Sequence, residues 1–372
     1  MRPLLILLVF TFNLFAAEIP AERTEAVRLQ VYLDQQNFSP GILDGKVGTY
    51  TKKAITAYNK KFGLQENDQE TVKARALAAI PNIYATAIVP DLVNDMVDAG
   101  FKHGNNRSYQ STRHDMPYRS VAEFMAERYH TSIDFLKLIN EPGVVKKATK
   151  RSALLVPNVE PFRIENLAAG RTHKKDDILS LRWAVIDTKA HQIRIYEPLE
   201  TTIPVADTDT ELSLESKEIA ETPPTDPLPI DGNVARATIV EDDPEPVQQL
   251  SAHDEHRALI VAAYPITPGK PQFIRYGTWK MLNAIELPTW RYDASLLQTG
   301  QRSNQSLQIP SGPNNPVGII WMGLSRKGIG IHGTDNPDKI GRGRSAGCIR
   351  LANWNAIKLP TMIRPGATGI IN

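Results

Sequence analysis

Residues Ile329 to Asn353 read IGIHGTDNPDKIGRGRSAGCIRLAN and contain Cys348, the only cysteine among the 372 residues of the chain. A single cysteine makes no disulfide within its own chain. It is therefore a packed apolar residue, a link to another molecule or a reactive thiol. A reactive thiol needs a base within hydrogen-bond reach and donors for the oxyanion of the intermediate. The residues around Cys348 supply candidates for both.

His332 ends a short apolar alternation that begins at Gly328 and predicts a strand. The loop that follows is rich in glycine and proline, and it is long enough to return the chain so that Cys348 lies beside His332. Gly347 leaves room for a substrate carbonyl, and its amide and that of Cys348 are candidates for an oxyanion hole. We also expect four nearby cations to favour the thiolate over the thiol: Lys339, Arg342, Arg344 and Arg350.

Each of these features also has a purely structural interpretation. An isolated cysteine is most often a buried apolar residue. A histidine after an apolar strand is most often a packed residue, and basic residues in a loop most often face solvent. Spacing and composition alone leave the catalytic and the structural interpretations open.

Several motifs together resemble one enzyme family. His332-Gly333-Thr334, followed by Ser345 to Arg350, resembles the signature of the L,D-transpeptidase catalytic domain, the YkuD family. Pro310 to Gly318 is similar to the PGPxNPLG run of that family, and Pro288-Thr289-Trp290 is similar to its NPTW. The TPxGxF segment of the family has only a loose counterpart, which we place at Tyr276 to Trp279.

The resemblance implies an enzyme that cross-links peptidoglycan through a thioester on Cys348, with His332 as the general base and the Gly333 carbonyl orienting its ring. It implies a tetrapeptide stem as acyl donor, loss of D-alanine, no cofactor or metal, and acylation by carbapenem-type β-lactams. Ser345 and Arg350 are candidates for holding polar and carboxylate groups of the substrate. Two alternatives remain open: an L,D-carboxypeptidase or cysteine peptidase that uses the same residues, and an inactive cell-wall-binding protein.

Four regions precede this domain. Residues 1–17 resemble a secretory signal peptide, because Arg2 is followed by a short apolar run and small residues. We therefore expect the protein in the periplasm or cell wall, with no stable membrane insertion after cleavage. Residues 22–80 show helical periodicity and resemble a peptidoglycan-binding domain. Residues 118–162 resemble a LysM-like βααβ module, whose family binds glycan strands, and residues 81–117 are expected to be a linker.

The fold class that we predict is multidomain α+β. Short alternating strands dominate residues 181–372 and predict a mainly-β sandwich for the catalytic domain. Strands at residues 183–187 and 192–196, joined by a short polar turn, indicate a hairpin. Residues 197–256 are rich in acidic residues and proline and poor in aromatics, which is typical of a disordered insertion.

Composition and charge add few constraints. The formal net charge is +2, and no long basic run is interleaved with aromatic residues, so nothing indicates nucleic-acid binding. His103 and His114 show no metal-ligand spacing, and we expect both at the surface.

Overall fold

The structure is a computed structural model that describes residues 19–104, 106–199, 255–295, 303–326, 328–345 and 347–372. The expected signal peptide and almost all of the expected acidic insertion lie outside these residues. In the described ranges, no helix is both long and apolar enough to cross a membrane.

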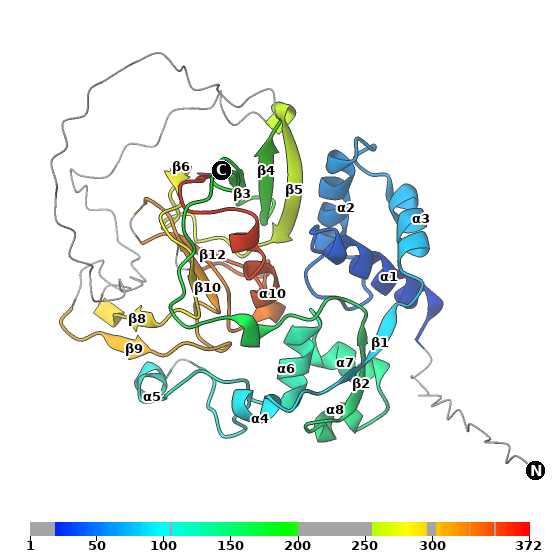
Figure 1. The fold of residues 1–372 in the computed structure, drawn as a ribbon, viewed down its shortest axis with the longest axis horizontal. Coiled ribbons are helices and arrows are strands. Elements are labelled where there is room, and N and C mark those ends of the chain that lie inside the picture. Colours follow the sequence, from blue (N-terminus) through cyan, green and yellow to red (C-terminus); the bar gives the residue numbers. More distant parts are fainter. Residues whose placement is uncertain (1–18, 105, 200–254, 296–302, 327, 346) are drawn as a thin grey trace, which may run out of the picture.

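The C-terminal half contains two β-sheets that form a sandwich (Figure 1). The first sheet has the order β5-β4-β3-β13-β6, and the second has the order β12-β11-β10-β7. The strands of these two sheets are β3 Trp183–Asp187, β4 Gln192–Pro198, β5 Ala258–Pro265, β6 Gly277–Lys280, β7 Ile285–Glu286, β10 Ile320–Gly323, β11 Gly330–His332, β12 Ile349–Arg350 and β13 Thr368–Ile371. The prediction of a β-sandwich is confirmed, and so is the antiparallel hairpin of β3 and β4.

Strand β3 explains how the sequence builds the first sheet. It lies at the centre, antiparallel to β4 and parallel to β13. Trp183 to Ile186 are all buried, as expected for a central strand that is covered on both faces. A further pair, β8 Trp290–Tyr292 and β9 Leu307–Ile309, forms a two-stranded sheet of its own.

Residues 22–80 are mainly helical, as their periodicity predicts. The helices are α1 Ala21–Gln35, α2 Thr49–Lys61 and α3 Gln69–Ala79. The turn between α1 and α2 is held by Gln30, whose side-chain oxygen accepts from the amides of Asp44 and Gly45 at 3.1 and 2.8 Å. Gly45 has a φ of 71° and no space for a Cβ, so Asp44-Gly45 is a structural turn. The helices join the sandwich through Ser39, whose amide donates to the carbonyl of Ala263 on β5 at 2.9 Å.

The region expected to be a linker is part of a folded unit. β1 Tyr84–Ile88 pairs antiparallel with β2 Ala153–Pro157, so one strand comes from within residues 81–117. Ser120 and Ser132 cap the helices α6 and α7 by accepting from backbone amides three residues on. The helices of this unit are α4 Val93–Met96, α6 Val121–Arg128, α7 Ile133–Ile139 and α8 Val144–Lys147, whereas α5 Arg107–Ser111 contacts β9 Leu307–Ile309. We call the unit the middle module; its LysM-like identity stays a prediction.

Buried polar contacts bind the three parts together. His130, after α6, lies 2.9 Å from Asp34 of α1 through Nδ1. Its ring stacks on Trp354 of α10, Asn353–Ala356, with centroids 5.6 Å apart. Lys358 approaches the same Asp34 carboxylate at 3.5 Å. His130 is therefore a packing residue.

Residues 98–118, here called the crossing segment, leave the middle module and run along the sandwich below β8 and β9 (Figure 1). Backbone hydrogen bonds fix this path, because the amide of Met116 donates to Ser311 at 2.9 Å and its carbonyl accepts from Asn314 at 3.0 Å. Phe101 and Met116 are buried. The short 3-10 helices complete the chain at η1 Ile164–Asn166, η4 Glu255–Arg257, η5 Pro337–Lys339 and η6 Leu359–Thr361.

Candidate active site

His332 and Cys348 lie on one face of the second sheet, on neighbouring strands. β11 and β12 run parallel, with His332 opposite Arg350. Two residues earlier on each strand, the same register brings Cys348 opposite Gly330. Because side chains alternate along a strand, Cys348, Arg350 and His332 project from the same face. The loop between the strands thus returns the cysteine to the side of the histidine, as the sequence predicts.

The ring of His332 is oriented by its own turn and by a tryptophan. Nδ1 lies 2.7 Å from the carbonyl oxygen of Gly333. A carbonyl only accepts, so Nδ1 carries the hydrogen and Nε2 keeps its lone pair. Trp321 of β10 is the register partner of His332 and stacks on it, with centroids 5.6 Å apart and planes 20° apart. A fixed ring with a lone pair is what proton abstraction requires.

Burial keeps the imidazole of His332 neutral. The residue is 3% exposed. Burial, reinforced by the positive charge of Arg350, lowers the pKa of His332 from 6.5 to about 3, against smaller opposing effects of the Gly333 carbonyl and Asp335. A neutral imidazole is ready to accept a proton at any pH near neutrality.

The thiol of Cys348 is also neutral at rest. Its sulfur donates to the carbonyl of Gly328 over 3.6 Å. Burial raises the pKa of the Cys348 thiol above its ordinary value, although the Gly330 amide and Arg350 act in the opposite direction. The expectation that a group of cations favours the thiolate is therefore wrong in its net direction. Of the four cations, only Arg350 acts on the thiol, because the other three are exposed to solvent: Lys339, Arg342 and Arg344.

Ser345 shapes the turn that carries Cys348. Its hydroxyl donates to the carbonyl of Cys348 and accepts from the amide of Gly347 at 3.3 Å. The residue is 3% exposed, so its hydroxyl serves the turn here. Gly347 has a φ of 132°, a conformation that only glycine adopts readily. The oxyanion role expected for Gly347 stays a prediction, since its amide is engaged by Ser345 in this arrangement.

Residues 267–270, directly after β5, hold the catalytic segment from the side opposite His332. Thr267 exchanges two backbone hydrogen bonds with Arg350, at 2.9 and 3.0 Å. Gly269 lies against Gly347 so closely that a Cβ on it would be 2.5 Å from the Gly347 carbonyl oxygen. No motif in the sequence led us to expect these residues in the site. The expected counterpart of the TPxGxF segment, Tyr276 to Trp279, instead lies at the edge of the first sheet, where β6 pairs with β13.

The crossing segment forms one wall of the site. Phe101 and Met116 belong to a buried apolar cluster with Trp321, and Cys348 packs against this cluster. These side chains exclude water from the region of the thiol, which accounts for the upward pKa shift of Cys348.

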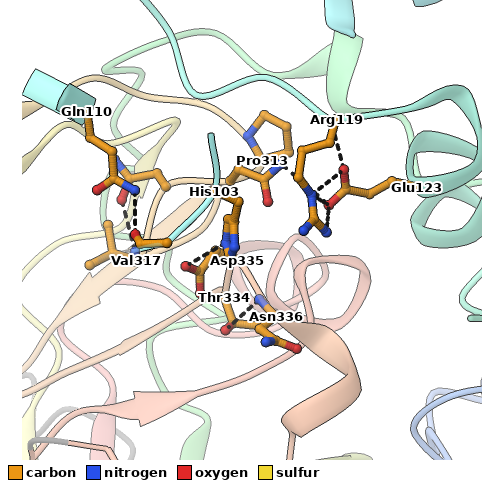
Figure 2. Close-up of polar contacts among 12 residues, drawn as sticks. His103, Gln110, Arg119, Glu123, Pro313, Val317, Thr334, Asp335 and Asn336 are labelled. Carbon is orange, nitrogen blue, oxygen red and sulfur yellow. Dashed lines mark hydrogen bonds and ion pairs between the residues drawn. The ribbon is translucent and has the colours of Figure 1, made fainter. Parts of the chain in front are cut away.

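A polar contact links the crossing segment to the loop after β11. His103 Nε2 lies 3.2 Å from Asp335 Oδ2, and both side chains are 20% exposed (Figure 2). The interpretation of His103 as a surface residue is therefore wrong, whereas His114 is exposed as expected. The sequence carries no signal for this pair, because its members are more than 200 positions apart.

Two arginines give the site a positive charge. The guanidinium of Arg107 lies 5.0 Å from the ring centroid of Trp290. Burial is the main cause that lowers the pKa of Arg107, and the positive charge of Arg350 lowers it further. Nε of Arg350 is buried and has no hydrogen-bond partner among the described residues. A buried guanidinium donor of this kind suits a carboxylate that arrives with a substrate.

Comparison with known proteins identifies the domain that contains this site. Residues 248–371 match the family model of the YkuD L,D-transpeptidase catalytic domain. The chain carries an L,D-transpeptidase catalytic domain. β3 and β4 precede the matched residues but belong to the same sheet as β13, so this sheet extends beyond the match. The identities expected for residues 22–80 and 118–162 are not confirmed.

The relatives match this chain over short stretches. YkuD of Bacillus subtilis (strain 168), named as an L,D-transpeptidase, is 43% identical over 60 residues, which are 16% of this chain and 37% of that protein. ErfK/SrfK of Escherichia coli (strain K12), named likewise, is 37% identical over 70 residues, 18% of this chain and 22% of that protein. The chain therefore spans between about a fifth and two fifths of the curated relatives that it matches. The crystal structure of L,D-transpeptidase 3 from Mycobacterium tuberculosis is 12% identical and covers 61% of this chain and 76% of that one, with a TM-score of 0.28.

The structure brings all of the predicted site residues together on β11, β12 and the turn before β12: Cys348, His332, Gly333, Gly347, Ser345 and Arg350. Their catalytic and substrate-binding roles stay predictions. Trp321 is the additional residue that the sequence could have offered, since it stands in an apolar run that predicts a strand. The register that stacks it on His332 is visible only in the fold.

Proposed function

We propose that this protein is a cell-wall L,D-transpeptidase that forms peptidoglycan cross-links by acyl transfer through Cys348. The observation that carries the proposal is that Cys348, directly before β12, lies on the same face as a neutral His332 on the adjacent parallel strand β11. Both groups are neutral at rest, so the thiol proton must leave as the sulfur attacks. An imidazole with a free Nε2 lone pair is suited to this concerted transfer.

The reaction begins with attack of the Cys348 sulfur on the carbonyl of a tetrapeptide stem while His332 Nε2 takes the thiol proton. The tetrahedral intermediate collapses with cleavage of the carbon–nitrogen bond, and His332 returns the proton to the leaving amine, which departs as D-alanine. An acceptor amine then attacks the thioester carbonyl while His332 removes its proton. The carbon–sulfur bond breaks, and His332 returns the proton to the Cys348 sulfur. The Gly333 carbonyl stabilises the transient imidazolium by accepting its Nδ1 hydrogen.

Arg350 is the candidate for the substrate carboxylate. It projects from the same face as Cys348, and its buried Nε lacks a partner among the residues that the structure describes. A guanidinium presents its donors in a fork that matches a carboxylate. A carbapenem-type β-lactam, which also presents a carboxylate beside a reactive carbonyl, is expected to acylate Cys348.

The front part of the chain fits the same setting. We propose that the helices of residues 22–80 and the middle module bind peptidoglycan, and that residues 1–17 direct export to the periplasm or cell wall. Retention on purified sacculi by the full chain with Cys348 replaced by alanine tests the binding claim without interference from turnover.

The test of the activity uses purified protein and Cys348→Ala, each incubated with a disaccharide-tetrapeptide. Cross-linked dimers with loss of D-alanine, formed by the wild type alone, would support the proposal, and we expect the substitution to reduce product formation by at least about 1,000-fold. Tripeptide monomers without dimers would favour the L,D-carboxypeptidase alternative. Identical inert profiles would favour the cell-wall-binding protein.

A further inference from the structure

Glu127 of the middle module is a buried acidic residue that faces the catalytic domain. It is 6% exposed, although it lies on α6, far from the catalytic strands in the sequence. Its two carboxylate oxygens each accept a hydrogen bond. One accepts from the Tyr118 hydroxyl at 2.5 Å, and the other accepts from Nδ2 of Asn353 at 3.0 Å. A buried carboxyl is costly, and retaining one at a contact between two domains calls for an explanation beyond packing.

Asn353 carries this contact to the catalytic histidine. Its Oδ1 accepts from the amide of Thr334 at 3.1 Å and from the amide of Ile319 at 3.4 Å. Thr334 follows Gly333, the residue whose carbonyl accepts from His332 Nδ1. Gly333 has no space for a Cβ, because Asn353 Oδ1 occupies that position. Asn353 thus sets the place of the turn that orients the imidazole.

We infer that Glu127 is a positioning residue of the active site, through which the middle module holds Asn353 and, with it, the turn that orients His332. Asn353 presents an oxygen to the turn only if its amide nitrogen points the other way. Glu127 supplies the nearer acceptor for that nitrogen, at 3.0 Å, and the Pro313 carbonyl lies at 3.4 Å. Without Glu127 the amide nitrogen keeps only the longer contact with the Pro313 carbonyl, which holds its rotation less firmly. The middle module then completes the catalytic centre in addition to any binding of glycan.

The surroundings of Glu127 agree with a role in orientation. Burial is the main cause that raises the pKa of Glu127, to about 8, with a smaller upward effect of Glu123, while Tyr118 and Asn353 act in the opposite direction. Glu123 is itself paired with Arg119 at 2.6 Å, as Figure 2 shows. In either protonation state one oxygen of Glu127 remains an acceptor for Asn353.

The inference rests on the proposed acyl transfer, so the experiment measures the two separately. The full-length protein is incubated with the disaccharide-tetrapeptide or with a carbapenem, and the rate of Cys348 acylation is followed by intact mass as a function of concentration. Failure of the wild type to be acylated counts against the proposed function. The inference itself is decided by the variants.

Glu127→Met keeps the volume of the side chain and removes its acceptors. Glu127→Gln keeps an oxygen for Asn353. The matched control is Arg128→Ala, because Arg128 is the next residue on α6, is equally buried and pairs with Glu165 at 2.8 Å. It contributes to the packing of the module but makes no hydrogen bond with Asn353 among the described contacts.

We expect Glu127→Met to lower the maximal acylation rate about 10- to 100-fold with little change in the half-saturating concentration, since a displaced base acts on the chemical step. Glu127→Gln should restore the rate to within about threefold, and Arg128→Ala should lose less than about threefold at a comparable loss of melting temperature. Equal losses in Glu127→Met and Arg128→Ala would overturn the inference, because the module would then act through stability alone.

A second variant approaches the same contact from the catalytic domain and guards against misfolding of the first. Asn353→Asp keeps the oxygen that accepts from Thr334 and removes the nitrogen that donates to Glu127. The expected loss of maximal rate is again about 10-fold or more. Combination with Glu127→Met should add little further loss, because the two changes remove the same contact. Strictly additive losses would reject the inference.

Discussion

Two sets of residues surround Cys348, one near to it in the sequence and one far from it. The near set is the loop of residues 337–344, which ends just before the catalytic turn and carries Lys339, Arg342 and Arg344. The far set consists of residues 267–270 and the crossing segment. The near cations are exposed and do not affect the pKa of the thiol. The far residues contact the catalytic turn directly or cover it.

The difference shows that burial outweighs nearby charge in this site. Burial is the first cause of both pKa shifts, upward for Cys348 and downward for His332. The effect of an exposed charge on a neighbouring pKa is strongly screened by water and salt, whereas removing water from around a group shifts its pKa without such screening. For Cys348, part of this burial comes from the far set, because the thiol packs against the cluster that contains Phe101 and Met116.

The largest effect that tests this comparison is expected at Gly269. A methyl group there would lie 2.5 Å from the carbonyl oxygen of Gly347 and 2.6 Å from its Cα, so Gly269→Ala must displace the catalytic turn. Displacement by about 1 Å costs roughly 100-fold in rate, and we expect a loss of this order in acylation of Cys348 by a carbapenem.

Gly343→Ala is the matched control in the near set. Gly343 is exposed, has no neighbour within 4 Å of an added Cβ and has no positive φ, so the acylation rate should change by less than about twofold. An equal loss of acylation rate in both alanine variants, or a loss in Gly343→Ala alone, would mean that the catalytic turn depends on the near loop.

A smaller effect is expected in the pH dependence of stability. The pKa of His332 is about 3 in the folded protein and 6.5 ordinarily. Between these values the unfolded chain binds a proton that the folded chain does not. Lowering the pH below 6.5 therefore favours unfolding. At pH 5 the cost is about 2 kcal/mol relative to neutral pH.

Urea unfolding of the wild type and of His332→Gln at pH 7 and pH 5 measures how much of the loss of unfolding free energy on acidification comes from His332. All other titrating groups are common to both proteins, so the wild type should lose about 2 kcal/mol more than the variant on acidification. Equal losses would mean that His332 titrates near its ordinary pKa, and the neutral resting pair would have to be abandoned.

The sequence predicts the part of the site that lies within one short stretch of the chain, residues 329–353. The alternation before His332, the glycine-rich loop and the lone Cys348 are enough to predict two strands side by side, and the catalytic motif needs no other information. Residues 267–270 and the crossing segment carry no comparable signal. Phe101 and Met116 are isolated apolar residues in polar surroundings, and neither periodicity nor a turn signal says which distant strand they cover.

The same reason explains the errors at residues 81–117 and at the TPxGxF counterpart. A five-residue strand such as β1 becomes stable only by pairing with β2, about 70 positions later, and a sequence pattern does not specify that partner. The threonine-proline-glycine run at residues 267–269 follows a strand in the first sheet, yet it contacts the second. Contacts between sheets depend on the fold and not on local preference.

The smallest expected effect concerns the near cations themselves. Cys348 is the only cysteine, so the rate of alkylation by iodoacetamide as a function of pH reports the titration of one thiol. Lys339→Ala, Arg342→Ala and Arg344→Ala should each leave the midpoint in place and change the rate at pH 8 by less than about twofold. Arg350→Ala should move the midpoint upward and slow alkylation at fixed pH, because Arg350 is the cation that stabilises the thiolate. An upward shift of the midpoint in any of the three loop variants, as large as that in Arg350→Ala, would show that cations near Cys348 in the sequence do stabilise its thiolate. The difference between the near and the far set would then concern packing only.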